Sequence, residues 1–210
     1  MNWITKVTPP GLKTMLAKKD TPDDLWVKCP LSGELVYKTD LEENWHVTPA
    51  GAHLRISPRT RLRLLFDDER WEPLALPSVP HDPLKFKDDK PYPSRLKAAK
   101  AKIAARDKKE AENGGAPIIQ EDCMVAAYGK IGGVPTVVLV QDFAFMGGSL
   151  GMAAGEGFVA AAQMALARKA GFVVCTASGG ARMQEGTLSL MQMPRTTLAI
   201  NELAEAKLPY

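Results

Sequence analysis

The chain has 210 residues, of which 45% are hydrophobic and 24% charged, a composition that excludes collagen-like, coiled-coil and wholly disordered proteins. Its 27 basic and 24 acidic residues leave a net charge of +3, which is too small by itself to indicate a nucleic-acid partner. Three cysteines are too few for a disulfide framework, and neither a signal peptide nor an apolar run of about 18 residues is evident, so a cytoplasmic protein without a membrane span is predicted.

Residues 1–70 are predicted to form a small N-terminal β module with short strands near 26–29, 34–37 and 53–56. A helix is expected from Ser57, because serine is a favoured N-cap residue and the proline that follows suits a first turn. Residues 71–115 read as a Pro-rich surface segment and a basic connecting helix, which we expect to be largely solvated.

Residues 116–210 are apolar and Gly-rich and are predicted to begin a larger α/β domain. The elements expected there are strands at 123–130 and 134–143 joined by a Gly132-Gly133 turn, a helix at 153–170, a strand at 172–176 and a helical pattern to 206 interrupted at Pro194. The continuously apolar strand at 172–176 predicts burial on both faces. The alternation of strands and helices predicts right-handed crossovers and a largely parallel sheet.

Two glycine pairs, Gly147-Gly148 and Gly179-Gly180, each lie between a predicted strand and a predicted helix start. Glycine permits positive φ and the close approach of a ligand, and the first turn of a helix offers unpaired N–H groups. Such turns can bind a phosphate, a carboxylate or an enolate oxygen. The alternative is that both pairs are tight turns in which glycine serves packing alone.

Several familiar site motifs are absent from the sequence. The first glycine turn lacks dinucleotide-binding spacing, and neither a P-loop nor a G-x-S-x-G motif occurs. All three histidines lie in the first half, which disfavours a Ser-His-acid triad. Asp142 and Glu156 are a possible carboxylate pair, although a capping or surface role is the alternative favoured for both.

Two long motifs resemble those of a known family, the beta subunits of bacterial acetyl-coenzyme A carboxylase carboxyltransferase. The motifs are Phe143–Gly151 and Ala177–Glu185, with support from Ser189–Met193, Asp82–Phe86, Tyr92–Leu96 and Trp3-Ile4. The resemblance implies an α/β crotonase-like (ClpP/crotonase) fold, a superhelix of ββα units, preceded by a small zinc-ribbon-like module. It covers nearly the whole chain.

The resemblance also implies the activity and its partners. The family transfers a carboxyl group from carboxybiotin, held on a carrier protein, to acetyl-CoA, giving malonyl-CoA for fatty acid synthesis. Expected partners are a carboxyltransferase alpha subunit in an α2β2 heterotetramer, the biotin carboxyl carrier protein and, in a wider ATP-binding complex, biotin carboxylase. The released biotin anion can itself remove the acetyl proton, so the resemblance requires no side-chain base.

On this basis the sequence indicates two sets of site residues. Gly179, Gly180 and Ala181 are expected to act catalytically, through backbone N–H groups that stabilise oxyanions. Substrate-binding positions, for CoA or biotin, are expected at Gly147, Gly148, Ser149, Ser178 and Arg182. Arg182 would meet a phosphate or carboxylate; the alternative is a structural ion pair, for example with Glu185.

The chain departs from the family pattern in two respects. At positions where many members carry four zinc-binding cysteines, it has Cys29, Ser32, Thr48 and Gly51, so no metal is predicted. The module is expected to hold its shape through apolar packing of Trp26, Leu35, Tyr37, Trp45 and Leu54. In the family, the sequence at Leu208-Pro209-Tyr210 leads into further ββα units, so we expect an incomplete C-terminus and no activity from this chain alone.

Two alternatives stay open. One is a subunit of another biotin-dependent acyl-CoA carboxylase or decarboxylase that accepts a larger acyl group. The other is a non-catalytic nucleic-acid-binding module, favoured by basic residues at Lys6, Lys13, Lys18, Lys19, Arg55, Arg59, Arg61 and Arg63. Acidic residues at 67–69 follow directly and favour a solvated surface instead.

Overall fold

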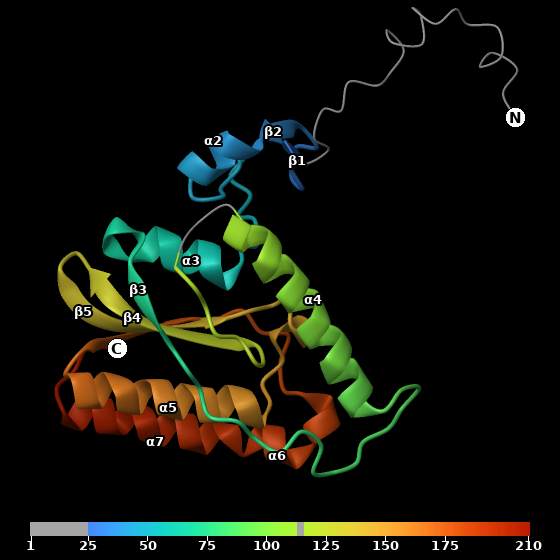
Figure 1. The fold of residues 1–210 in the computed structure, drawn as a ribbon, viewed down its shortest axis with the longest axis vertical. Coiled ribbons are helices and arrows are strands. Elements are labelled where there is room, and N and C mark those ends of the chain that lie inside the picture. Colours follow the sequence, from blue (N-terminus) through green and yellow to red (C-terminus); the bar gives the residue numbers. More distant parts are fainter. Residues whose placement is uncertain (1–24, 113–115) are drawn as a thin grey trace, which may run out of the picture. The chain divides into compact units, whose positions relative to one another are not determined.

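A computed structural model describes residues 25–112 and 116–210, and its chain separates into two compact units, Met1–Arg55 and Ile56–Tyr210 (Figure 1). The basic positions 6, 13, 18 and 19 of the nucleic-acid hypothesis and the Trp3-Ile4 match lie outside the described residues. Within the described ranges, no helix is both long enough and apolar enough to cross a membrane.

The first unit is a small β module. Strands β1 (Trp26–Lys28) and β2 (Leu35–Tyr37) pair antiparallel, and helix α2 (Lys38–Glu43) follows them. Side chains alternate between the two faces of a strand, so Val27 and Val36 turn to one face of the pair and pack with the small core. The buried members of that core are Cys29, Val36, Leu41 and Ala52.

The predicted core of this unit was therefore largely wrong. Trp26, Leu35 and Trp45 are 54%, 65% and 60% exposed, and Tyr37 is half-buried in contact with the Trp26 ring. Among the residues predicted for the core, only Leu54 packs against it. The reason is register: Trp26 and Tyr37 pair across the strands on the face opposite to the buried valines.

The boundary between the units lies at Arg55/Ile56, whereas the sequence placed a boundary at residue 70. Helix α3 (Pro58–Leu65) begins as predicted, with the Ser57 hydroxyl accepting a hydrogen bond from the Thr60 N–H. Its apolar side belongs to the second unit, because Leu62 and the following Phe66 pack in one cluster with strands of the main sheet. A short 3-10 turn, η2 (Asp67–Glu69), follows α3.

The main sheet has the strand order β3 (Trp71–Leu74), β4 (Met124–Ile131), β5 (Val134–Gln141), β6 (Gly171–Cys175). Only β5 and β6 run parallel, so the prediction of a largely parallel sheet was wrong. The turn at Gly132 and Gly133, both with positive φ, closes β4 and β5 into a hairpin, which must be antiparallel. Helix α5 (Met152–Arg168) then crosses over to β6 and completes one ββα unit with its return strand.

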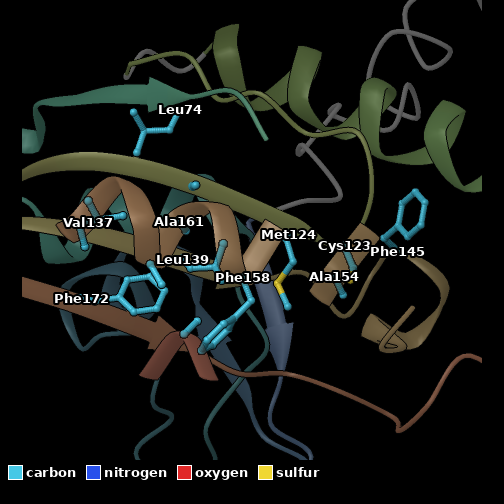
Figure 2. Close-up of a cluster of buried hydrophobic side chains, with 14 of the residues drawn as sticks. Leu74, Cys123, Met124, Val137, Leu139, Phe145, Ala154, Phe158, Ala161 and Phe172 are labelled. Carbon is cyan, nitrogen blue, oxygen red and sulfur yellow. The ribbon is translucent and has the colours of Figure 1, made fainter. Parts of the chain in front are cut away.

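Successive side chains of β4 and β5 point to opposite faces of the sheet and pack into two separate hydrophobic clusters. Met124, Ala126, Val137 and Leu139 pack with α5 and with α7 (Gln192–Glu205) on one face of the sheet (Figures 1 and 2). The residues between them, Val125, Ala127, Val138 and Val140, pack against α3 on the opposite face. Because both faces are covered there, the stretches Met124–Ala127 and Val137–Val140 are continuously apolar instead of alternating with polar residues.

Strand β6 does not share this burial. Val173 is 39% exposed, so the expected burial of this strand on both faces is not found in the described structure. Its other face is buried through Phe172, which packs edge-on against Phe158 of α5 (Figure 2). β6 occupies one edge of the sheet, and the helices described cover only its α5 side.

Helix α4 (Tyr92–Glu112) and the last helices complete the second unit. Most of α4 is exposed as predicted, but Tyr92, Leu96 and Ile103 enter the main core, so the helix is an integral part of the second unit. The final helical pattern divides into α6 (Thr187–Leu190) and α7. Pro194 lies in the first turn of α7, where its missing N–H leaves no hydrogen bond unmade, so the predicted interruption near it is confirmed.

Candidate functional site

The two glycine turns lie side by side and are hydrogen-bonded to each other. We call residues 145–151, which include the 3-10 turn η3 (Met146–Gly148), the first glycine loop, and residues 177–182 the second glycine loop. Three backbone hydrogen bonds join them: Gly179 N–H to Gly147 O at 2.9 Å, Leu150 N–H to Gly180 O at 2.8 Å and Arg182 N–H to Leu150 O at 2.8 Å. Leu150 and Ala181 thereby form a parallel bridge, so the two motifs make one structure.

Close contact between these loops explains one glycine in particular. A Cβ atom added at Gly148 would lie 2.0 Å from the carbonyl oxygen of Ala177, and its φ of +62° already disfavours other residues. At Gly147 and Gly180 the added atom would meet nothing within 4 Å, although both have positive φ. Gly148 thus serves packing, while the other two positions leave open space beside the backbone.

A buried amide side chain connects the same loops. Gln141, at the end of β5 and 4% exposed, donates from Nε2 to the Gly148 carbonyl at 2.6 Å. Its Oε1 accepts a hydrogen bond from the Ala177 N–H at 3.2 Å. One side chain therefore fixes a backbone group of each loop, and we assign Gln141 to positioning them.

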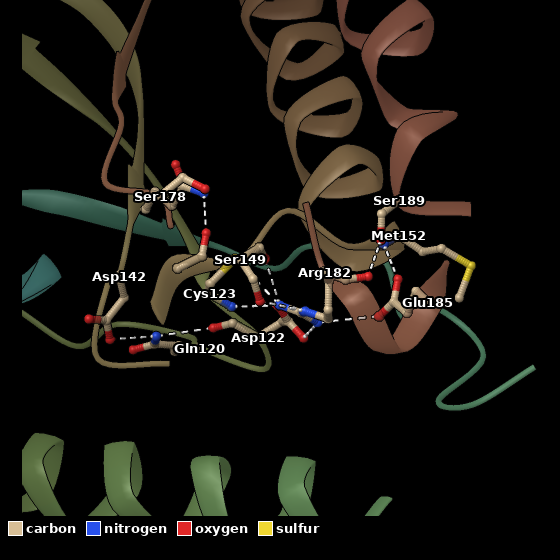
Figure 3. Close-up of polar contacts among 12 residues, drawn as sticks. Gln120, Asp122, Cys123, Asp142, Ser149, Met152, Ser178, Arg182, Glu185 and Ser189 are labelled. Carbon is tan, nitrogen blue, oxygen red and sulfur yellow. Dashed lines mark hydrogen bonds and ion pairs between the residues drawn. The ribbon is translucent and has the colours of Figure 1, made fainter. Parts of the chain in front are cut away.

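Arg182 is the centre of a buried polar network (Figure 3). Its guanidinium is 1% exposed and forms two hydrogen bonds with Asp122, at 2.6 and 2.8 Å. It also donates to the Ser149 hydroxyl at 3.0 Å and the Ser149 carbonyl at 2.9 Å. The Glu185 carboxylate lies 3.4 Å from the Arg182 guanidinium and is its second acidic partner. Arg182 is therefore enclosed by protein groups, and its expected direct contact with a ligand is not supported; the alternative of a structural ion pair fits the geometry.

Burial and charge shift the titration of the groups in this network. Burial opposes the charge on Arg182, but the hydrogen bonds and ion pair with Asp122 outweigh it and raise the pKa of the guanidinium above its usual value. Burial raises the pKa of the Tyr92 hydroxyl, which donates to Glu185 at 2.6 Å. Burial, assisted by the Asp122 charge, also raises the pKa of the Cys123 thiol. Arg182, Tyr92 and Cys123 therefore keep their protons near neutral pH.

The start of α5 does not offer the anion site that the sequence suggested. The Glu185 carboxylate accepts a hydrogen bond from the Met152 N–H at 2.6 Å and so occupies this helix N-terminus (Figure 3). A Cβ atom at Gly151 would lie 2.7 Å from the same carboxylate, which leaves no room for a second anion. The protein itself provides the negative charge there.

The backbone amides expected to be catalytic differ in availability. The Gly179 N–H donates to Gly147, and the Gly180 N–H donates to the Ser178 hydroxyl at 3.0 Å, so neither meets the expectation of an amide open to a ligand. Within the described part of the chain, the N–H of Ala181 has no hydrogen-bond partner. Ser178 and Ala181 are exposed, whereas Ser149 is half-buried and engaged by Arg182.

Asp142 and Glu156 do not form an acid–base pair. Asp142 is buried, forms an ion pair with Arg106 of α4 at 2.8 Å and accepts a hydrogen bond from Gln120 at 2.9 Å. Glu156 is bound by Arg195 of α7. Both carboxylates tie helices to the sheet or to each other, and the structural role favoured for them fits this geometry.

Two hollows are lined in part by residues of the glycine loops. One, of about 410 Å³, lies between the sheet, α5 and α7 and includes Gln141, Leu150 and Ser178 in its lining. The other, of about 690 Å³, lies between the start of α4 and the two glycine loops and includes Ser149 and Ala181. Both loops therefore border open space, as a binding site requires.

The first unit shows how the expected zinc positions are occupied. The Cys29 thiol and the Thr48 hydroxyl are hydrogen-bonded at 3.2 Å, Ser32 N–H lies 3.4 Å from the sulfur, and Ala52 N–H donates to Thr48 Oγ1 at 3.0 Å. One thiol with two hydroxyls does not fit the ligand chemistry of a structural zinc ion. No cluster of three potential metal ligands occurs among the described residues, and the zinc-free module stays a prediction.

Sequence reasoning missed Gln141, Asp122 and Tyr92. A signal existed for Gln141, because a glutamine at the end of an apolar strand must find buried hydrogen-bond partners. Asp122 directly precedes an apolar strand, but its pairing with Arg182, 60 residues later in the chain, follows only from the fold. Tyr92 lay in a segment taken for a surface connection.

Comparisons with known proteins agree with this arrangement. The model of the carboxyl transferase domain family matches residues 100–210. The chain is 83% identical over its full length to the acetyl-coenzyme A carboxylase carboxyl transferase subunit beta of Hyphomonas neptunium, and 60% identical to that of Hirschia baltica. It spans 64% and 56% of the length of these relatives.

A solved structure extends the likeness to the fold. Transcarboxylase 12S, crystallised with methylmalonyl-coenzyme A, matches 71% of this chain and 24% of its own at 26% identity and a TM-score of 0.51. The crotonase-like α/β fold expected from the resemblance is confirmed, with one ββα unit and β6 in the described sheet. Since the family model matches more than half of its residues, this chain belongs to the carboxyl transferase domain family.

Proposed function

We propose that the protein transfers the carboxyl group of carboxybiotin to acetyl-CoA, producing malonyl-CoA for fatty acid synthesis. The observation that carries this proposal is the full-length similarity, at 83% identity, to a carboxyl transferase subunit beta of acetyl-coenzyme A carboxylase. The paired glycine loops support it, because they are held by buried side chains and still border two hollows.

The proposed carboxyl transfer depends mainly on stabilising oxyanions and does not require a side-chain base. The acetyl thioester passes through an enolate, and carboxybiotin leaves as a ureido anion that can take the acetyl proton. We assign the open N–H of Ala181 to hydrogen bonding with such an oxygen, or with a polar group of the ligand beside it.

The two hollows are shaped by residues of both glycine loops, namely Gly147, Gly148, Ser149 and Ser178, and the Ser178 side chain is exposed to a ligand. Gln141 and Arg182 hold both loops in place and act as positioning residues.

The proposed function includes partners. Carboxybiotin would arrive on a carrier protein, and a carboxyltransferase alpha subunit would complete an α2β2 assembly in the cytoplasm. Biotin carboxylase would supply the carboxylated carrier. The similarity to subunit beta proteins supports a multi-subunit enzyme, and the partial coverage of those relatives supports our expectation that this 210-residue chain is inactive alone.

The test compares two forms of the protein. One is the 210-residue chain; the other joins it to the part of the Hyphomonas neptunium relative that it does not match. Each is mixed with the alpha subunit of that organism and a carboxybiotin donor, and malonyl-CoA is measured. We expect product from the joined form alone. The proposal fails if the joined form is folded and assembled but makes no malonyl-CoA.

A related activity on a larger acyl group is the second candidate, favoured by the likeness to transcarboxylase 12S, whose structure contains methylmalonyl-coenzyme A. The joined form distinguishes the two when it is given acetyl-CoA and propionyl-CoA in parallel. We expect the higher kcat/KM with acetyl-CoA. A preference for propionyl-CoA would assign the chain to the other class of acyl-CoA carboxylase.

A further inference from the structure

The larger hollow beside the glycine loops has a distinct chemical character. We call it the α4 groove; its floor and walls come from three segments that are far apart in the sequence. They are the start of α4 with the residues before it, the first glycine loop, and the second glycine loop with the start of η4 (Met183–Glu185). The lining residues are Lys90, Ser94, Arg95, Ala98, Met146, Ser149, Ala181, Met183 and Gln184.

One side of the α4 groove is cationic. Lys90 and Arg95 line it, and no acidic residue does. Asp88, outside the lining, holds the Arg95 guanidinium with both carboxylate oxygens at 2.6 Å and so fixes its direction. The Lys90 ammonium has no ion-pair partner among the described residues and is free to neutralise an anion. An anionic group entering the groove would meet one fixed and one adaptable cation.

Two methionines also line the α4 groove. They are Met146 and Met183, and the Met183 side chain is 68% exposed. Methionine is flexible and polarizable and packs well against flat ring systems. Ser94 and Gln184 add hydrogen-bonding groups, and the open N–H of Ala181 lies at the end formed by the glycine loops.

We propose that the α4 groove binds the nucleotide end of the coenzyme A ester, with phosphates at Lys90 and Arg95 and the base against Met146 and Met183. This assignment rests on the proposed function. A phosphorylated nucleotide combines several negative charges with one flat ring, which matches a groove lined by two cations and two methionines. The ester's thiol arm would then extend toward Ala181 and its bridge with Leu150.

The decisive variant is Lys90→Gln, because this side chain is exposed and its loss removes one positive charge without breaking an internal ion pair. In the joined form with its alpha subunit, KM is measured for acetyl-CoA and for acetyl-pantetheine, which lacks the nucleotide. We expect KM for acetyl-CoA to rise about fivefold, the effect of one exposed charge contact, with KM for acetyl-pantetheine unchanged. The matched control is Lys102→Gln, an exposed lysine of α4 outside the groove, which should leave both values unchanged.

Each outcome decides the assignment. An unchanged KM for acetyl-CoA, or an equal rise for both substrates, would overturn it while leaving the proposed function intact. If the joined form makes no malonyl-CoA, calorimetric binding of CoA and pantetheine to the same protein replaces the kinetics. Weaker binding of CoA alone by Lys90→Gln would then support the groove without the activity, and equal binding by both proteins would overturn it.

Discussion

At the scale of single residues, the buried polar groups determine the shape of the candidate site. Arg182 and Gln141 do not face solvent, yet each contacts backbone groups of the loops whose geometry would matter to a ligand. A buried charge lowers the stability of a protein unless it is paired with an opposite charge. The Arg182 guanidinium is paired in this way with the carboxylates of Asp122 and Glu185, so removing any partner would destabilise the network. The glycine loops thus depend on side chains from β5, α4 and the segment before β4.

Replacing Arg182 by methionine is expected to destabilise the second unit strongly. The partly buried Asp122 and the buried Glu185 would lose their shared cation, and breaking a buried ion pair by removing one partner costs about 3–5 kcal/mol in the free energy of unfolding. Urea unfolding followed by tryptophan fluorescence measures the change. Lys100→Gln is the control, since its exposed ion pair with Glu121 is worth at most about 1 kcal/mol. Equal stabilities of the two variants would contradict the structural role of Arg182.

Cys29 is expected to ionise at an unusually low pH. Hydrogen bonds from Ser32 and Thr48 lower the pKa of its thiol to about 7. Because the folded state releases this proton before the unfolded chain does, the first unit gains stability as pH rises above 7 and loses it as pH falls through 7. Ultraviolet thiolate absorbance should show one such titration, absent in Cys29→Ser, since burial raises the pKa of Cys123 and Cys175. Titration of all three thiols in the ordinary range would contradict this.

At the scale of elements, the space available to a side chain distinguishes the two glycines of one pair. Gly148→Ala would place a methyl group 2.0 Å from the Ala177 carbonyl and push the glycine loops apart, whereas Gly147→Ala would meet nothing within 4 Å. Gly147→Ala is therefore expected to cost only the strain of its positive φ, about 1–2 kcal/mol. Gly148→Ala should cost clearly more and raise amide exchange across both loops. Thermal unfolding and hydrogen exchange check this pair, and equal effects would show that the loops do not pack as described.

Most elements could be predicted from local sequence, and their pairing could not. The Gly132-Gly133 turn, the Ser57 cap and Pro194 specify where strands and helices start or stop through backbone geometry alone. Sheet direction depends on which connection is a hairpin and which is a crossover, and the general α/β pattern favoured parallel pairing where the turn required antiparallel pairing. In the first unit, the pairing of Trp26 with Tyr37 decided which face was buried, and aromatic character alone predicted the wrong one.

The candidate site shows the same division. The two glycine pairs were evident from the sequence, since few residues tolerate such turns. Glu185 at the N-terminus of α5, and Arg182 with Asp122, could not be foreseen, because these contacts cross 33 and 60 residues of the chain. Those partners differ from the simplest expectation: Glu185 of the protein itself occupies the helix start, and the Arg182 guanidinium is hydrogen-bonded to Ser149 of the first glycine loop.

At the scale of the whole molecule, the surface of α6 and α7 is unusually apolar. Leu190, Met191, Met193 and Leu198 are 51%, 55%, 48% and 62% exposed. Exposed apolar surface of this kind favours association between molecules in water. The isolated 210-residue chain is therefore expected to associate with itself as its concentration rises.

Leu198→Lys should reduce that association, because it replaces the most exposed of these four apolar side chains with a charge. Asn201→Lys adds the same charge at an exposed polar position of α7 and separates the effect of net charge from that of apolar area. Sedimentation at increasing protein concentration measures both. We expect the leucine variant to stay monomeric at concentrations where the unaltered chain and the asparagine variant associate. If the two variants behave alike, charge rather than the apolar patch controls association of the chain.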